Sequence, residues 1–260
     1  VAIEQTVALA RSFGAHASLV VAGPKIAAPY TMFSTTLVGS LVKSENEKIR
    51  GLADGIAGEV EDALKHAGVT GEVELCLEFF QDLLLKVKGH ALCTDLTVLD
   101  RPGGVIERSE VLFEEMLFGT GKPVLIAVPD RKPVETIEKI VLAWDGSVHA
   151  ARATSAALAL FADLKQVDVL IVTGEKDLSN SVPGAKAAAH IERHGVKAKV
   201  AEVPVDRTGV ATTIDSYAAK NGADLIVMGG FGRSRLREFV LGGVTRQLSQ
   251  SASTLLMLVH

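Results

Sequence analysis

The sequence predicts an α/β fold with two tandem domains, each a five-stranded, mostly parallel, doubly wound sheet with helices on both faces. Short apolar runs alternate with Ala-rich helical segments, the pattern of βαβ units around a parallel sheet. Hydrophobic residues make up 48% of the 260 residues and aromatic ones only 5%, so aliphatic side chains dominate the core. Similar stretches also recur at an offset of about 127 to 129 residues, which indicates a duplicated domain.

Strand and helix alternate through the second half of the chain. Ser147 is expected to cap the first helix and Asp206 the third, while Gly195 ends the second. The expected strands are 139–144, 166–172, 197–203, 224–228 and 254–259, and the expected helices are 149–164, 183–193, 207–220 and 243–250.

The first half repeats this order. H-A-G-V at 66–69 resembles R-H-G-V at 193–196, and T-D-L-T-V-L at 94–99 resembles A-D-L-I-V-M at 223–228. Residues 117–128 correspond to the last helix and strand of the second half. We therefore expect domains at 1–130 and 135–260, joined by a linker that holds P-D-R-K-P.

Two features distinguish the first half. Residues 1–13 already form the Ala-rich first helix, so this chain is expected to lack the opening strand of that domain. The segment 22–44 is about twenty residues longer than its counterpart and is open to interpretation as a lid, an interface arm or a surface loop. Ser44-x-x-Glu47 resembles a capping box that starts a helix running to His66.

Composition narrows the class of protein. A net charge of −4 and a pI of about 6.0 predict no global attraction to nucleic acid or to an anionic membrane. Cys76 and Cys93 have no metal-binding spacing and are expected to be small apolar core residues in a reducing compartment. No membrane span or signal peptide is evident, so we expect a cytoplasmic protein.

A glycine-rich loop follows the predicted strand 224–228. Gly229 and Gly232 leave its carboxyl end, and Gly242 and Gly243 stand where the last helix begins. Because the first amides of a helix lack acceptors, the loop could cradle a phosphate, or it could be only a tight turn. Arginines add local positive charge, at Arg233, Arg235, Arg237 and Arg246.

A carboxylate is predicted at the same end of the sheet. Asp145 follows the first strand of the second half, and its oxygens could accept hydrogen bonds from a ribose hydroxyl or an adenine amine. A turn-forming Asp-Gly is the alternative.

These motifs together resemble those of the universal stress protein family. Gly229-x-x-Gly232, nine residues, and Gly242 resemble its nucleotide-binding signature, and A-D-L-I-V-M-G and A-W-D-G-S are similar to its strands. The resemblance covers the second half fully and the first in outline, and it implies a Rossmann-like fold that binds ATP, with or without Mg²⁺. It implies that Asp145 lies near the adenosine and Val172 against adenine. The residues implied at the ribose and phosphates are Met228, Gly229, Gly232, Gly242, Gly243, Val244 and Thr245.

One position departs from the family pattern. The residue after the third motif glycine is usually Ser or Thr and is here Gly243, so a hydroxyl worth about 1.5–3 kcal/mol against a phosphate is missing. The first half lacks the motif and is predicted to bind no nucleotide. The resemblance further implies that the halves pack as a pseudo-dimer through 123–128 and 254–259, and that two chains associate.

Other chemistries find less support in the sequence. His190 and His194 have the i, i+4 spacing of zinc ligands but no third ligand, and His149 is expected as a solvated first-turn residue. Neither a G-x-S-x-G elbow nor a P-loop lysine is present, so any hydrolysis should be slow.

Two functions therefore remain open. The first is a stress-response protein that binds ATP or a related adenine nucleotide in its second domain, with at most a weak ATPase activity. The other is a nucleotide-independent interaction module in which Gly243 has eroded the site. A nucleotide-dependent transferase would need a catalytic pair that the sequence does not present.

Overall fold

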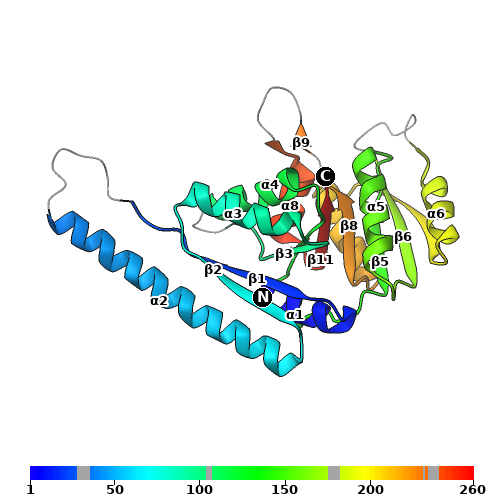
Figure 1. Ribbon diagram of the computed structural model, residues 1–260. Coiled ribbons are helices and arrows are strands. Elements are labelled where there is room, and N and C mark those ends of the chain that lie inside the picture. The colour runs from blue at the N-terminus through cyan, green and yellow to red at the C-terminus, as the bar shows by residue number, and fades with distance from the viewer. Residues whose placement is uncertain (28–35, 104–106, 175–181, 231, 234–239) are drawn as a thin grey trace. The chain divides into compact units, whose positions relative to one another are not determined.

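The computed structural model describes residues 1–27, 36–103, 107–174, 182–230, 232–233 and 240–260 (Figure 1). The chain folds as two compact units, one formed by Thr6–Cys93 and the other by Val1–Gln5 with Thr94–His260. The predicted domains, 1–130 and 135–260, were defined by repeated sequence, whereas these units are defined by contacts. The predicted domain boundary therefore stays a prediction.

A seven-stranded sheet runs through the larger unit. Its strand order is β3-β4-β11-β8-β5-β6-β7, and every neighbouring pair is parallel except β4 and β11. The strands are β3 (Thr97–Leu99), β4 (Val124–Ile126), β5 (Lys139–Ala143), β6 (Gln166–Thr173), β7 (Lys197–Pro204), β8 (Leu225–Gly229) and β11 (Leu255–Val259). The predicted α/β class is confirmed.

The central strands are aliphatic because helices cover both faces of the sheet. All five residues of β11 are buried, and so are Leu225, Ile226 and Val227 in β8. Helices α5 and α6 pack on one face, and α7 and α8 on the other. The helices of this unit are α4 (Glu107–Gly119), α5 (Val148–Leu160), α6 (Gly184–Arg193), α7 (Val210–Lys220) and α8 (Gly243–Ser251).

The last strands of the two halves pair with one another. β4 and β11 run antiparallel, with Leu256 opposite Ile126 and Leu258 opposite Val124. The expectation that 123–128 and 254–259 pack together is confirmed. β11 is thereby hydrogen-bonded on both sides, to β4 and to β8.

The smaller unit holds the other strands of the first half. β1 (Ala17–Ala22) and β2 (Gly71–Cys76) form a parallel pair, and α2 (Thr36–Ala67) and α3 (Phe80–Leu92) pack on them. α1 (Ala2–Phe13) precedes β1. In the second half β5 lies between β6 and β8 and is hydrogen-bonded to both. The described first half has no counterpart of β5, and its strands lie in two separate sheets.

Three predicted helix ends differ from the observed ones by three residues or more. α2 begins at Thr36, eight residues before Ser44, so Ser44 lies inside the helix and is not its N-cap; Val42 and Asn46 on either side of it are partly buried. Of the segment 22–44, residues 28–35 lie outside the described residues.

The other two differences concern helix ends in the second half. α7 begins at Val210 after Gly209, because the Asp206 carboxylate accepts hydrogen bonds from the amides of Thr208 and Gly209 and so forms a turn before the helix. α5 ends at Leu160 rather than at residue 164.

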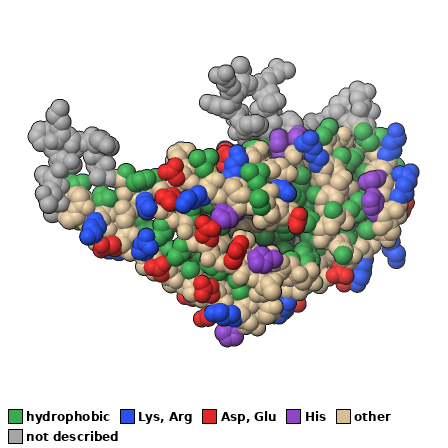
Figure 2. Space-filling view, viewed as in Figure 1, with side chains coloured by type: hydrophobic (Ala, Val, Ile, Leu, Met, Phe, Trp, Pro, Cys, Tyr) green, Lys and Arg blue, Asp and Glu red, His purple; other side chains and the backbone are tan. Residues whose placement is uncertain are grey.

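Charge is dispersed over the visible face of the molecule (Figure 2). Acidic and basic side chains are interspersed on the face that Figure 2 shows. Among the described carboxylates Asp168 in β6 is fully buried; it accepts a hydrogen bond from Tyr217 at 3.3 Å and lies 3.1 Å from Lys199 Nζ. These contacts compensate for the desolvation of the carboxylate near the amino end of β6.

Candidate functional site

The sheet reverses its strand order between β5 and β8. From β5 the chain adds β6 and β7 on one side, and then returns to add β8 on the other side of β5. Ala143 of β5 lies beside Met228 of β8, so the turns that follow these strands leave the same edge. Such a switch point at the carboxyl ends of parallel strands is where α/β sheets bind ligands.

The turn after β5 is held by a tryptophan. Trp144 is buried, and its Nε1 atom donates a hydrogen bond to the carbonyl of Val182 at 2.8 Å. Asp145 follows and is exposed, and its Oδ1 atom accepts a hydrogen bond from the amide of Ser147 at 3.0 Å. The Ser147 hydroxyl accepts from the amide of Ala150, so the predicted N-cap of α5 is confirmed. Asp145 therefore shapes the turn and still presents its carboxylate to solvent.

Gly229 closes β8 directly against the first turn of α5. A Cβ atom added there would lie 2.6 Å from the Cβ atom of His149 and 2.8 Å from the amide nitrogen of Ala150. Backbone atoms cannot move aside as a flexible side chain can, so this position requires glycine. The contact brings the start of α5 and the start of the glycine loop together.

His149 is not the solvated residue that the sequence predicted. It is partly buried, and its ring stacks on that of His260 with centroids 4.5 Å apart. The ring of Phe118 meets His260 edge-on at 4.9 Å, and the Nδ1 atom of His260 lies 3.0 Å from the carbonyl oxygen of Gly230. Burial lowers the pKa of His149, and His260 and Arg152 lower it further.

The last helix of the sheet begins with two glycines. Gly242 is the N-cap of α8, and no side chain caps this helix within the described part of the chain. Gly243 is exposed, and a Cβ atom added to it would meet nothing within 4 Å. Because β8 and β11 are parallel, the start of α8 lies at the carboxyl edge. Its first amides and its dipole favour an anion there.

A short hairpin stem carries the arch between the two glycine pairs. β9 (Gly232–Arg233) pairs antiparallel with β10 (Val240–Leu241), so Gly232 stands opposite Leu241. Arg235 and Arg237 lie outside the described residues, and the side chain of Arg233 does too. Arg246 lies in α8 and is exposed.

The other predicted site residues lie at different depths. Val172 is the last residue but one of β6 and is partly exposed, and Met228 is buried in β8. Val244 is partly exposed in the first turn of α8. Thr245 is only 1% exposed, whereas Gly243, two residues earlier in α8, is exposed.

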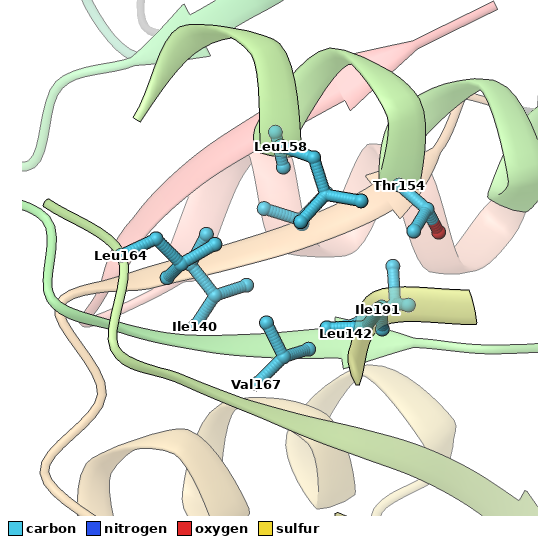
Figure 3. Close-up of a pocket in the computed structure, with 9 residues that line it drawn as sticks. Ile140, Leu142, Thr154, Leu158, Leu164, Val167 and Ile191 are labelled. Atoms are coloured by element: carbon cyan, nitrogen blue, oxygen red, sulfur yellow. The ribbon is translucent and has the colours of Figure 1, made fainter. Parts of the chain in front are cut away.

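A small cavity lies elsewhere, between α5 and the sheet (Figure 3). Its volume is about 10 Å³, and it is lined by Leu142, Leu158, Val167, Ile191 and other residues, of which Thr154 alone is polar. The Thr154 hydroxyl donates to the carbonyl of Ala150 at 2.9 Å. With so little room and no free polar group, this cavity is a packing defect of the core and no ligand site.

The remaining sequence candidates do not gather into sites. His190 and His194 are exposed neighbours with ring centroids 4.9 Å apart, and no cluster of three metal-ligating side chains occurs among the described residues. Cys76 is buried as expected, whereas the expectation for Cys93 was wrong because it is exposed at the end of α3. In the described chain no helix is both long and apolar enough to span a membrane.

A sequence model of the universal stress protein family matches residues 136–260. This is the half that carries the switch point, the Asp145 turn and both glycine pairs. Residues 136–260 belong to the universal stress protein family. Over 230 residues the chain is also 27% identical to universal stress protein Slr1230 of Synechocystis sp., which covers 85% of this chain and 77% of that protein.

Solved universal stress protein structures share the fold of the whole chain. A universal stress protein from Archaeoglobus fulgidus DSM 4304 superposes with a TM-score of 0.69 at 13% identity, over 99% of this chain and 92% of that one. A putative universal stress protein from Pseudomonas aeruginosa UCBPP-PA14 gives a TM-score of 0.54 at 14% identity, over 93% and 92% of the two chains. At these identities the likeness concerns the fold alone.

Proposed function

We propose that the second half of this tandem universal stress protein binds ATP or a related adenine nucleotide, with or without Mg²⁺, in a cytoplasmic stress response. Asp145 and Val172 would hold the adenosine, one through its carboxylate and the other through apolar contact. The backbone of Gly229, Gly232 and Gly242 would hold the ribose and phosphates. Met228, Gly243, Val244 and Thr245 complete the proposed lining.

The observation that carries this proposal is the contact between Gly229 and the first turn of α5. It brings the Asp145 turn and the glycine loop to one switch point, and the uncapped start of α8 lies at the same edge. The edge thus offers a carboxylate for hydroxyl or amine donors and backbone amides for an anion, the two kinds of group that a nucleotide requires.

We expect the protein to hydrolyse the bound nucleotide slowly or not at all. No lysine stands among the described residues at the start of α8, so that part of the chain lacks the charge that a P-loop lysine supplies in phosphoryl transfer. His149 is the nearest titratable neighbour of Gly229, and it stacks on His260.

A nucleotide-independent interaction module is the second candidate, and two observations favour it. Gly243 supplies no hydroxyl, and Thr245, the next hydroxyl-bearing residue of α8, is buried. In this alternative the fold persists and the glycine edge is only a set of tight turns.

Calorimetric titration of the purified protein with MgATP, ADP and AMP separates the two candidates. We expect binding in the micromolar to millimolar range, which Asp145→Ala weakens by about tenfold through loss of charged hydrogen bonds. Asp163→Ala, which removes an exposed carboxylate beyond α5, is the matched control and should bind like the wild type.

The possible outcomes are distinct. No heat at millimolar nucleotide would refute nucleotide binding and support the interaction module. Tight binding that Asp145→Ala leaves unchanged would keep the nucleotide but move it away from the β5–β8 edge.

A further inference from the structure

α2, the longest helix that the structure describes, presents a face with large exposed apolar side chains. α2 runs for 32 residues, about 48 Å at 1.5 Å per residue. One stripe packs inward, through Ala53, Ala57, Val60 and Leu64. On another side of α2 the side chains of Leu52 and Ile56 are 70% and 43% exposed.

Three glycines adjoin these apolar side chains. A Cβ atom added to Gly51, Gly55 or Gly58 would meet nothing within 4 Å, so no packing within the described chain requires a glycine there. Glycine destabilises the interior of a helix, and three within eight residues make this stretch of α2 a weak one. Glycine does let the backbone of a second helix approach closely, to about 8 Å between axes.

Charges of both signs flank the glycines and the leucine. Lys48 and Glu59 are exposed on the same side as Leu52, and Figure 2 shows charges of both signs over α2. The two residues are eleven positions apart, about 16 Å along the helix, so they cannot pair within one chain. Lys48 contacts Glu45 at 2.7 Å, whereas Glu59 has no cationic partner among the described residues.

This arrangement is complementary to itself under a two-fold rotation. Suppose that two α2 helices pack antiparallel and that the two-fold axis passes between residues 53 and 54. Residue i of one copy then lies at the same height along the helix pair as residue 107 − i of the other copy. Lys48 then meets Glu59 of the second copy, and the reverse pair forms on the other side of the axis. Near the axis Leu52 packs against Ile56 of the second copy, while Gly51 faces Gly55 and keeps the backbones close. Glu45 of one copy and Asp62 of the other are at the same height but lie on opposite sides of the contact between the helices, so these two carboxylates do not meet.

We propose that this face of α2, defined by Lys48, Gly51, Leu52, Gly55, Ile56 and Glu59, is a homodimer interface formed by antiparallel pairing with a second copy of the chain. A two-fold axis makes the same patch serve both partners, which is how isologous dimers are built. β11 already pairs with β4 and β8, so that strand has no free edge for a second copy, whereas apolar side chains of α2 are exposed.

The size of the face predicts a weak dimer. From residue 41 to residue 66 the strip is about 39 Å long and about 10 Å wide, roughly 800 Å² for the two copies together. Stable dimers bury about 1,200–2,000 Å² or more, so this contact belongs among transient associations. The monomer–dimer equilibrium should therefore be visible between about 10 µM and 1 mM protein.

Charge reversal in sedimentation equilibrium tests the pairing. Lys48→Glu and Glu59→Lys should each weaken the dimer at least tenfold, because every substitution places two like-charge pairs at the interface. The double variant Lys48→Glu/Glu59→Lys should restore the dissociation constant to within about threefold. Lys43→Glu/Glu47→Lys, which reverses an ion pair on another side of α2, is the control and should leave it unchanged.

Glycine substitution separates an interface from an ordinary exposed helix. Gly51→Ala/Gly55→Ala should raise the Tm of the protein, since alanine favours the helix, and should weaken the dimer because the added methyl groups part the backbones. A protein that remains monomeric at 1 mM overturns the proposal. A dimer that neither charge reversal nor glycine substitution weakens also overturns it and assigns association to another surface.

Discussion

The Cα atom of Gly229 faces His149 so closely that a Cβ atom on it would lie 2.6 Å from the Cβ atom of His149. This contact joins the end of β8 to the start of α5 and so fixes the distance between the glycine loop and the Asp145 turn. Both the stability of the second half and the proposed nucleotide site depend on it.

Gly229→Ala should therefore damage both properties. The methyl group would press on the Ala150 amide and the His149 backbone, which costs about 1–3 kcal/mol as in other overpacked cores, and nucleotide affinity should fall with the displaced turn. Urea unfolding and calorimetry measure the two effects. Gly243→Ala adds the same methyl group in open space and should change neither by more than about 0.5 kcal/mol. Equal effects of both substitutions would show that close packing at Gly229 is not the cause.

Gly243→Ser should strengthen nucleotide binding. Open space surrounds the Cβ position and the residue is exposed at the start of α8, so the new hydroxyl can reach a phosphate without strain. A hydrogen bond to a charged group is worth about 1.5–3 kcal/mol, so ATP affinity should rise by about tenfold or more and AMP affinity by less. Gly243→Ala separates the hydroxyl from the methyl group. If the serine and alanine variants bind ATP alike, the phosphates do not lie at Gly243.

Trp144 should report nucleotide binding by its fluorescence. It is the sole tryptophan of the chain, it is 8% exposed, and it directly precedes Asp145. A nucleotide at Asp145 would alter the packing and polarity around the indole and its bond to Val182. We expect a saturable change on titration with ATP that Asp145→Ala diminishes and Asp163→Ala preserves. A titration that produces heat but no fluorescence change would place the ligand far from β5.

The stability of the protein should decline as the pH falls through the ordinary pKa of histidine, about 6.5. Burial, His260 and Arg152 lower the pKa of His149 in the folded protein, so the unfolded chain takes up a proton first. The free energy of unfolding therefore decreases from pH 7.5 towards pH 5.5. His149→Gln should reduce this slope in urea unfolding, whereas the exposed His190→Gln should not. An identical slope in wild type and His149→Gln would contradict the assignment.

Periodicity and cap residues were enough to predict most strands and helices of the second half. β5, β6, β7 and α8 begin at the predicted residues, since buried aliphatic runs and terminal glycines such as Gly195 act locally. The packing of β4 against β11 could also be expected, but only through resemblance to a family, and its antiparallel direction comes from the structure.

Long-range packing explains what the sequence could not predict. The stacking of His149 on His260 joins residues 111 positions apart, and no local pattern marks either histidine as buried. The start of α2 at Thr36 was hidden because Ser44 and Glu47 imitate a capping box within a continuing helix. Trp144 could have been recognised as a positioning residue, since a lone tryptophan beside an Asp-Gly turn needs a hydrogen-bond acceptor when it is buried.

The pairing of β4 with β11 has a consequence for dividing the chain. β11 pairs with β4 of the same polypeptide, so this pairing does not depend on protein concentration. The covalent connection keeps the local concentration of β4 high even in dilute solution. Residues 136–260 expressed alone would lose that tethered strand and expose the backbone of β11, a row of aliphatic residues. Such a fragment should self-associate edge to edge, so the first half protects the second from aggregation whether or not it binds any ligand of its own.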